Sequence, residues 1–355
     1  MPKDPTPQRI AVVLFNLGGP DRPEAVRPFL FNLFKDPAIL QVPGPVRLML
    51  AYLISRRRAK PAGEIYERLG GKSPLLDNTI AQALALEEAL GGGGETRVFI
   101  AMRYWHPMAD ETAYQVKEYN PDRVVLLPLY PQFSTTTSAS SVKNWERAAK
   151  AAGLDKPTSV VCCYPTEPGF ITAEAELIRA RVEEAKAHGA PRVLFSAHGL
   201  PRKVVRGGDP YQWQCEETAR AVVAELGMQG LDWVNCYQSR VGPLEWIGPA
   251  TDAEIARAGR DKVPLVVVPI AFVSEHSETL VELDIEYREL AHVQGVPFFA
   301  RVPTVGVEPV FIEALAALVR RMVSAPPGLC SQQGGRICPS GFTGCPQRGV
   351  RGKPA

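Results

Sequence analysis

Several segments of the chain are continuous apolar runs, and each ends in a turn of glycine, proline or polar residues. The runs cover 9–16, 96–102, 122–129, 192–196, 233–237 and 264–272. Runs of this length that are apolar on both faces are typical of strands buried in a parallel sheet. Helical patterning lies between them, for example at 23–33, 173–187 and 215–226. The alternation predicts an α/β fold with parallel sheets.

Two of these strands resemble two others further along the chain. The segment at 9–20, RIAVVLFNLGGP, is similar to RVLFSAHGLP at 192–201, and RVVLLPLYPQFS at 123–134 is similar to LVVVPIAFVSE at 265–275. We therefore predict two similar Rossmann-like, doubly wound domains at 1–160 and 161–323, followed by a cysteine-containing tail at 324–355. Such folds bind ligands at the carboxyl ends of their strands, so we expect a crevice there, between the domains.

Composition narrows the class of protein. The 355 residues exceed the roughly 250–300 that one hydrophobic core serves, which agrees with two domains. Hydrophobic residues make up 45% and charged residues 22%, as in an ordinary globular protein. A net charge of +2 gives no basic field for nucleic acid. The polar start of the chain and the lack of an apolar run of about 18 residues predict a cytoplasmic protein.

One histidine and a row of glutamates are the first candidates for chemistry. His198 follows a predicted strand, in the turn SAHGLP. The segment SEHSETLVELDIE begins at Ser274, a plausible helix N-cap, directly after another strand. Its four glutamates, spaced three, four and four residues apart, would form one line along a helix: Glu275, Glu278, Glu282 and Glu286. A histidine facing carboxylates suits a divalent cation or a proton path, and a solvated acidic helix face is the alternative.

Cationic and aromatic residues give a second set of candidates. Arg103 and Tyr104 follow the strand at 96–102, where a guanidinium and a ring suit a planar anionic substrate. The apolar segment LMLAYLIS at 48–55 runs into three arginines, Arg56, Arg57 and Arg58. Such a stretch rests on an anionic membrane or grips carboxylates, and the alternative is a core helix with a solvated basic end.

These motifs together resemble the ferrochelatase family. The matching segments are NLGGP at 16–20, YERLGGKSPL at 66–75, RYWHP at 103–107, LYPQFSTTT at 129–137, LFSAHGLP at 194–201, GDPY at 208–211, YQSRVGPLEWIGP at 237–249 and PIAFVSEHSETLVELDIEY at 269–287. The likeness covers residues from about 9 to 322. It implies two similar Rossmann-like domains with a porphyrin cleft between them.

The resemblance also assigns roles to positions of this chain. It implies that His198 and Glu278 are ligands of ferrous iron, with Glu282 a further acidic catalytic position and Glu275 a residue for iron delivery. Five positions would line the porphyrin cleft: Ser73, Arg103, Tyr104, Tyr237 and Phe272. Arg57 and Arg58 would hold propionates at its rim. The segment 34–58 would form an apolar lip that touches a membrane surface.

The cysteines near the end of the chain set it apart from a minimal member of the family. Cys330, Cys338 and Cys345 are spaced x7 and x6, whereas the remote ligand position of the animal enzymes is Thr135 here. The resemblance implies a [2Fe-2S] cluster, which needs a fourth thiolate. Cys162 or Cys163 is the first choice, and then Cys215 or Cys236. Zinc at the same ligands and a disordered tail with free thiols are the alternatives.

The function implied is insertion of iron(II) into a porphyrin with release of two protons, the terminal step of haem biosynthesis. Protoporphyrin IX is the favoured substrate, and a coproporphyrin stays open. Alternatives are a chelatase for another metal, such as cobalt, and a non-catalytic carrier of iron or tetrapyrrole. The sequence also leaves open whether His198 binds the metal or accepts a proton, and whether the chain forms a homodimer.

Overall fold

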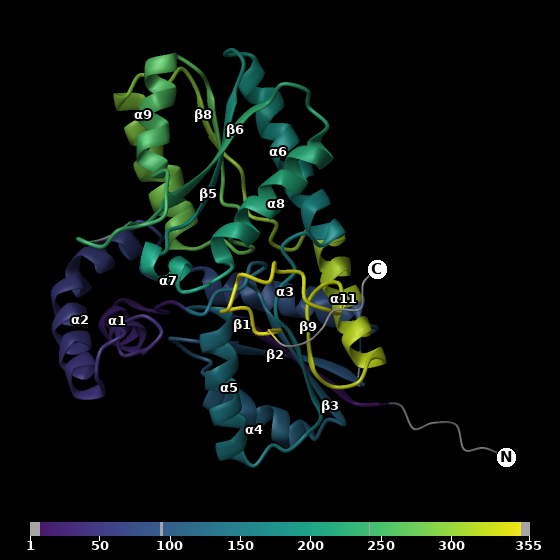
Figure 1. The fold of residues 1–355 in the computed structure, drawn as a ribbon. Helices are drawn as coiled ribbons and strands as arrows, with labels where there is room; N and C mark the ends of the chain where they lie inside the picture. Colours follow the sequence, from purple (N-terminus) through teal and green to yellow (C-terminus); the bar gives the residue numbers. More distant parts are fainter. Residues whose placement is uncertain (1–7, 93–94, 241, 349–355) are drawn as a thin grey trace. The chain divides into compact units, whose positions relative to one another are not determined.

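The computed structural model describes residues 8–92, 95–240 and 242–348, which form two compact units (Figure 1). Described residues of the first unit fall within Met1–Cys163 and Ile312–Ile337, and those of the second within Tyr164–Phe311 and Cys338–Arg348. Both units are therefore discontinuous in sequence, whereas the predicted domains at 1–160 and 161–323 are continuous. Residues 312–337 join the first unit because strand β9 (Leu329–Cys330) pairs with β4 (Thr158–Val161). Strand β9 has only two residues and is too short to recognise in a sequence.

The first unit is built on a five-stranded parallel sheet in the order β2-β1-β3-β4-β9. Its other strands are β1 (Ile10–Asn16), β2 (Thr96–Met102) and β3 (Arg123–Pro128). Helices α4 (Ala109–Tyr119) and α5 (Ser138–Ala152) bury one face, against alternate residues of β1 and β3. Helix α3 (Leu75–Ala89) and helix α11 (Pro309–Ser324) accompany the other side of the sheet in Figure 1.

The second unit is built on a four-stranded parallel sheet in the order β6-β5-β7-β8. Its strands are β5 (Arg192–His198), β6 (Asp232–Gln238), β7 (Leu265–Val268) and β8 (Phe299–Arg301). Its helices are α6 (Pro168–Lys186), α7 (Arg202–Arg206), α8 (Tyr211–Leu226), α9 (Thr251–Asp261) and α10 (Tyr287–Val293). Helices α9 and α10 pack with strand residues in one apolar cluster, while α6 and α8 pack against each other.

The two units share one strand order. In each, the first strand lies between the second and the third, and the fourth follows the third. The similarity of the two halves of the sequence is therefore confirmed in topology, since β1 corresponds to β5 and β3 to β7. In such sheets the connections change direction beside the first strand, and ligands bind outside the carboxyl ends of the strands at that point. Each unit thus has one such switch point.

Two boundaries differ from the prediction, and both lie beside the switch point of the second unit. Strand β7 ends at Val268, because Pro269 has no N–H to donate to a neighbouring strand. The helix expected from Ser274 begins later, as a π-helix η2 (Glu278–Glu286) with Ser277 as its N-cap residue. Ser274 is therefore not the cap. Its carbonyl oxygen lies 3.2 Å from Nδ1 of the buried His276.

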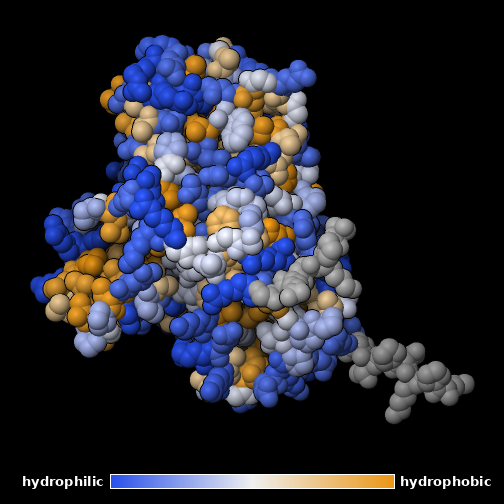
Figure 2. All heavy atoms as spheres, viewed as in Figure 1, coloured by the Kyte–Doolittle hydropathy of each residue, from blue (hydrophilic) through white to orange (hydrophobic). Residues whose placement is uncertain are grey.

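The segment expected to form the apolar lip is mostly helical. The short 3₁₀ helix η1 (Pro23–Ala25) leads into α1 (Val26–Phe34), and α2 (Gly44–Glu67) packs against α1. Five apolar side chains of α2 are exposed: Val46, Leu48, Met49, Tyr52 and Leu53. Figure 2 shows a hydrophobic surface over this helix. Within the described residues, no helix is both long enough and apolar enough to cross a membrane.

Candidate active site

His198 is the last residue of β5, at the switch point of the second unit. The chain turns there because Gly199 packs closely on the neighbouring strand. Its N–H donates to the carbonyl of Gln238 at 2.9 Å, and a Cβ at this position would lie only 2.8 Å from the same oxygen. A glycine is therefore required, and the turn leaves the imidazole with 40% of its side chain exposed.

The imidazole is paired with a carboxylate of the π-helix. His198 Nδ1 lies 2.9 Å from Oε2 of Glu278, the first residue of η2. Burial alone would lower the pKa of His198, but the charge and hydrogen bond of Glu278 outweigh it and raise that pKa above its ordinary 6.5. Burial would raise the pKa of Glu278, yet the same pairing lowers it to about 2. The pairing therefore favours the charged form of each partner, a histidinium and a carboxylate.

A serine between the strands and the π-helix holds the second carboxylate of the site. Ser239 follows β6 in a left-handed backbone conformation, with φ at +57°. Its N–H donates to Glu282 Oε1 at 2.8 Å, and its hydroxyl donates to Glu282 Oε2 at 2.5 Å and to Glu278 at 3.5 Å. Burial and the charge of Glu278 raise the pKa of Glu282 in spite of these bonds. Sequence reasoning missed Ser239, because no pattern marks a left-handed serine after a strand.

The predicted single line of four glutamates is wrong. Glu275 precedes the helix, where its carboxylate accepts bonds from Arg301 at 2.8 Å and from the N–H of Thr304 at 3.0 Å. Glu286, at the far end of η2, is exposed. The structure therefore brings Glu278 and Glu282 to His198 and directs Glu275 toward a fixed cation, because the helix starts at Glu278 and not at Ser274.

Aromatic side chains lie beside this group in the second unit. The rings of Phe272 and His276 lie 4.6 Å apart, and burial lowers the pKa of His276. Tyr237 lies in β6 opposite Ala197, and its buried hydroxyl has no hydrogen-bond partner among the described residues. Tyr237 and Phe272 thus belong to the surroundings of the His198 strand end.

At the switch point of the first unit, Arg103 and Tyr104 were expected to face a substrate, but both bind a carboxylate of the protein itself. Arg103 donates to Asp36 at 2.7 Å and to the hydroxyl of Ser140 at 2.8 Å. The hydroxyl of the buried Tyr104 donates to the same Asp36 oxygen at 2.7 Å, and Ser140 donates to it at 2.6 Å. Asp36, which sequence reasoning missed, therefore accepts hydrogen bonds from the two side chains that were expected to face a substrate.

The other candidates of the first unit lie in two places. Ser73 is buried against the loop after β1: its N–H donates to Pro20 O, and a Cβ on Gly19 would lie only 2.5 Å from its hydroxyl oxygen. Arg57 and Arg58 are exposed on α2. The guanidinium of Arg58 lies 5.8 Å from the centre of the Phe34 ring, and neither arginine has an ion pair among the described residues.

The cysteines divide between the units. In the first unit, the N–H of Cys162 donates to Cys330 O at 2.8 Å, and the Cys162 and Cys163 sulfurs are 3.5 Å apart. In the second, Cys338 Sγ accepts from Gln214 at 3.2 Å, and Cys345 is buried. Across residues 8–92, 95–240 and 242–348, no group of three or more His, Cys, Asp or Glu is placed to hold a metal ion.

Comparisons with known proteins agree on one family. The ferrochelatase family profile matches residues 9–323. A ferrochelatase of Caulobacter vibrioides is 56% identical over 96% of this chain and 98% of its own, and one of Rickettsia bellii is 49% identical over 95% of each. The structure of SirB from Bacillus subtilis with Fe3+ shares the fold at a TM-score of 0.52, with 11% identity, over 88% of this chain and 95% of its own. The chain therefore belongs to the ferrochelatase family, the metal-chelating lyases of haem synthesis that insert iron(II) into a porphyrin.

Proposed function

We propose that iron(II) binds between His198 Nδ1 and Glu278 Oε2 before it enters the porphyrin ring. The observation that carries this proposal is their contact of 2.9 Å at the switch point. An imidazole nitrogen and a carboxylate oxygen are ligands that suit ferrous iron. Resident structural metals usually have four protein ligands, whereas a metal that must leave is better served by fewer. Two ligands at a partly exposed histidine fit a substrate metal.

The proton balance of the site follows from its charges. The charge of Glu278 favours the protonated ring, so in this proposal His198 holds the proton of the 2.9 Å contact and iron(II) has to displace it. The reaction also removes two protons from pyrrole nitrogens. Glu282 is suited to take one, because a base is most effective when its pKa is moved toward the working pH, and His198 regains the other once the metal has left it for the ring. Ser239 keeps this carboxylate beside the pair.

An insertion assay that compares a Glu278 variant with the unchanged protein tests this assignment. Glu278→Gln keeps the shape of the side chain and removes its charge, so iron insertion should fall by about two orders of magnitude or more. Thermal unfolding of each variant checks that it is folded. Turnover near that of the unchanged enzyme in folded Glu278→Gln would remove Glu278 as a ligand.

For the porphyrin, we propose protoporphyrin IX with its propionates held by Arg57 and Arg58. Arg103 is already committed to Asp36, while the two exposed arginines of α2 keep all their donors for carboxylates. Rates with protoporphyrin IX and coproporphyrin III should favour the former. Substitution of Arg57 and Arg58 by Gln should raise KM more than it lowers kcat, because these residues would bind substrate without touching the reacting centre. A preference for the coproporphyrin would overturn the substrate assignment.

We also propose that α2 rests on an anionic membrane surface. Its exposed residues Leu48, Met49 and Leu53 precede Arg56–Arg58, so apolar burial and charge attraction act together. The protein should sediment with phosphatidylserine-containing vesicles and should be released by salt. Leu48→Asp should weaken this binding, whereas Leu84→Asp, at a leucine exposed on α3, should not. Equal loss in both variants, or no binding at low salt, would contradict the proposal.

For the cysteines, we propose a [2Fe-2S] cluster held by Cys330, Cys338, Cys345 and one of Cys162 and Cys163. What supports the fourth ligand is the backbone bond between Cys162 and Cys330, which joins the remote pair to the first tail cysteine. Cys215 and Cys236 fit less well, because burial raises the pKa of both thiols, that of Cys236 to about 12.

Visible absorption, iron and sulfide analysis test the cluster on anaerobically purified protein. The protein should be coloured, and Ser at each of the three tail positions should bleach it. Replacing Cys162 and Cys163 in turn should identify the remaining ligand, while Cys236→Ser should keep the colour. A colourless protein without bound iron or sulfide would overturn the proposal, and zinc in place of iron would change the centre but keep the ligands.

A further inference from the structure

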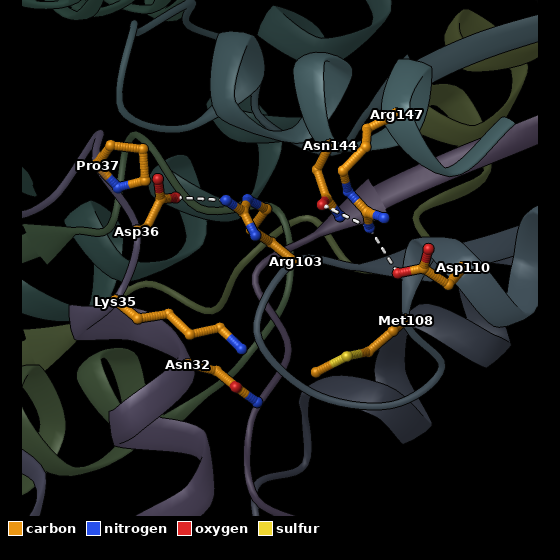
Figure 3. A pocket seen from close by; sticks show the side chains of 9 residues that line it. All are labelled: Asn32, Lys35, Asp36, Pro37, Arg103, Met108, Asp110, Asn144 and Arg147. Atoms are coloured by element: carbon orange, nitrogen blue, oxygen red, sulfur yellow. Dashed lines mark hydrogen bonds and ion pairs between the residues drawn. The ribbon is translucent and has the colours of Figure 1, made fainter. Parts of the chain in front are cut away.

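A polar cavity lies in the first unit, and none of its lining residues belongs to the proposed iron-binding group. It has a volume of about 310 Å³, is open to solvent on one side and is shown in Figure 3. Its walls come from α1 and the loop after it, from the segment after β2, and from the facing sides of α4 and α5. Nothing in the proposed insertion step uses this cavity, so we asked which ligand its chemistry fits.

Within the described residues, one of the three cations that line the cavity has no carboxylate partner. Three cations line it, Lys35, Arg103 and Arg147, against two carboxylates, Asp36 and Asp110. Asp36 is saturated by Arg103, Tyr104, Ser140 and a backbone N–H. Asp110 is paired with Arg147 at 2.6 Å. Lys35 has no carboxylate partner among the described residues, and its amine lies 5.7 Å from the Phe31 ring. In Figure 3 this amine points into the cavity, toward Met108.

Two amides add directional groups to the walls. Asn32 donates its Nδ2 to Tyr104 O at 3.1 Å, which leaves its Oδ1 as an acceptor. The Oδ1 of Asn144 accepts from Arg147 at 3.3 Å, which leaves its Nδ2 as a donor. The cavity therefore offers an ammonium, an amide donor and an amide acceptor. A matching ligand carries a negative charge, an acceptor oxygen and a hydroxyl donor.

We propose that this cavity binds a small free hydroxycarboxylate, of the size of malate. The carboxylate of the ligand pairs with the Lys35 ammonium and accepts a hydrogen bond from Asn144 Nδ2. Its hydroxyl donates to Asn32 Oδ1. The volume lies at the small end of the range for ligand pockets, which limits the occupant to a few carbons. Because Lys35 and Arg147 are exposed, the attraction is screened, and we expect a dissociation constant in the millimolar range that rises with salt.

Calorimetric titration of the full chain with three probes tests the proposal. Malate and succinate differ by one hydroxyl, so malate should bind about threefold or more tightly if Asn32 accepts from it. Inorganic phosphate, which has charge but no carbon hydroxyl, should bind more weakly than malate. Lys35→Met should weaken malate binding about tenfold or more, because it removes the unpaired charge. Lys150→Met, at an exposed lysine of α5, is the matched control and should leave binding unchanged.

Three results would overturn the proposal. Absence of malate binding at low salt would leave the cavity without this ligand. Equal binding of malate by Lys35→Met, with an unchanged melting temperature, would place the ligand elsewhere. Equal binding of malate and succinate, with both displaced by porphyrin, would indicate that a propionate of the tetrapyrrole occupies the cavity in place of a free hydroxycarboxylate.

Discussion

The two units offer the same scaffold and use it differently. Each has its first strand between the second and third, and each gathers polar residues where that strand ends. In the first unit, β1 ends at Asn16, whose amide is bound to Thr79 and whose oxygen accepts from Leu17. In the second, β5 ends at His198, which is partly exposed and paired with Glu278.

The difference lies in which cation faces the carboxylate. Asp36 in the first unit is neutralised by Arg103, which keeps its proton at all ordinary pH values. Glu278 in the second unit faces His198, whose imidazole is a titratable group that can give up its proton. An arginine pair is permanent and therefore structural, whereas, as proposed above, the histidine pair exchanges its proton for a metal. On that proposal, the switch point serves stability in one unit and chemistry in the other.

The largest expected effect is on catalysis in the second unit. His198→Ala removes both the ligand and the exchangeable proton, so iron insertion should fall by about three orders of magnitude or more. The melting temperature should change little, since the ring is partly exposed. His292→Ala, at the end of α10, is the control and should keep full turnover. Near-normal turnover of folded His198→Ala would break the comparison at its centre.

The next effect is on stability in the first unit. Asp36→Asn leaves Arg103, only 17% exposed, without its counter-charge, which should cost about 3–5 kcal/mol of unfolding free energy. Asp110→Asn breaks the Arg147 pair, whose side chains are 57% and 50% exposed, and should cost less than about 1 kcal/mol. Urea unfolding measures both. A small loss in Asp36→Asn would mean that this pair is not structural.

The third effect is a shift in pH dependence. In the unchanged protein, insertion should rise as the pH passes the raised pKa of His198, above 6.5, because iron(II) needs the deprotonated ring. Glu278→Gln removes the charge that raises this pKa, so the remaining activity should have its inflection at lower pH. Stability has the opposite sign, because a raised histidine pKa stabilises the fold at low pH and the gain is lost as the pH rises through it. An inflection that does not move would separate His198 from the activity.

The smallest effect is expected at the exposed end of the π-helix. Glu286→Gln should leave insertion within about twofold, because the side chain is exposed and eight residues beyond Glu278. The same assay on Glu278→Gln gives the contrast. Equal small losses in both would favour a solvated acidic face over a metal site, whereas a large loss at Glu286 would extend the site along the helix.

Much of the fold was predictable because strands buried in a parallel sheet have continuous apolar sequences. Strands β1, β2, β3, β5 and β6 lie where the sequence predicts them, and His198 lies at a strand end as expected. Strand β7 ends at Val268 and not at residue 272 as predicted; Pro269 was the signal for this end, but the continuous apolar run around it was given more weight. The strand β9 was not, since two residues carry no periodicity and their pairing with β4 depends on a distant segment.

The details of the site were less predictable, because they depend on backbone geometry. A π-helix is rare, and the expected α-helix from Ser274 placed Glu275 and Glu278 on one helix, so their separation was not foreseen. The conformation of Ser239 and the role of Asp36 depend on residues far away in sequence. The sequence predicted which polar residues follow the strands, but it did not predict the residues that pair with them.

Proton release on metal binding tests most directly the claim that His198 exchanges its proton for a metal. Calorimetric titration with iron(II) under anaerobic conditions, repeated near pH 6.5 in two buffers of different ionisation enthalpy, gives the number of protons released per metal bound. Because the pKa of His198 is raised above 6.5, we expect more than half a proton per metal for the unchanged protein, and for His198→Ala much weaker binding with no such release. Tight iron(II) binding with equal proton release in both proteins would contradict it.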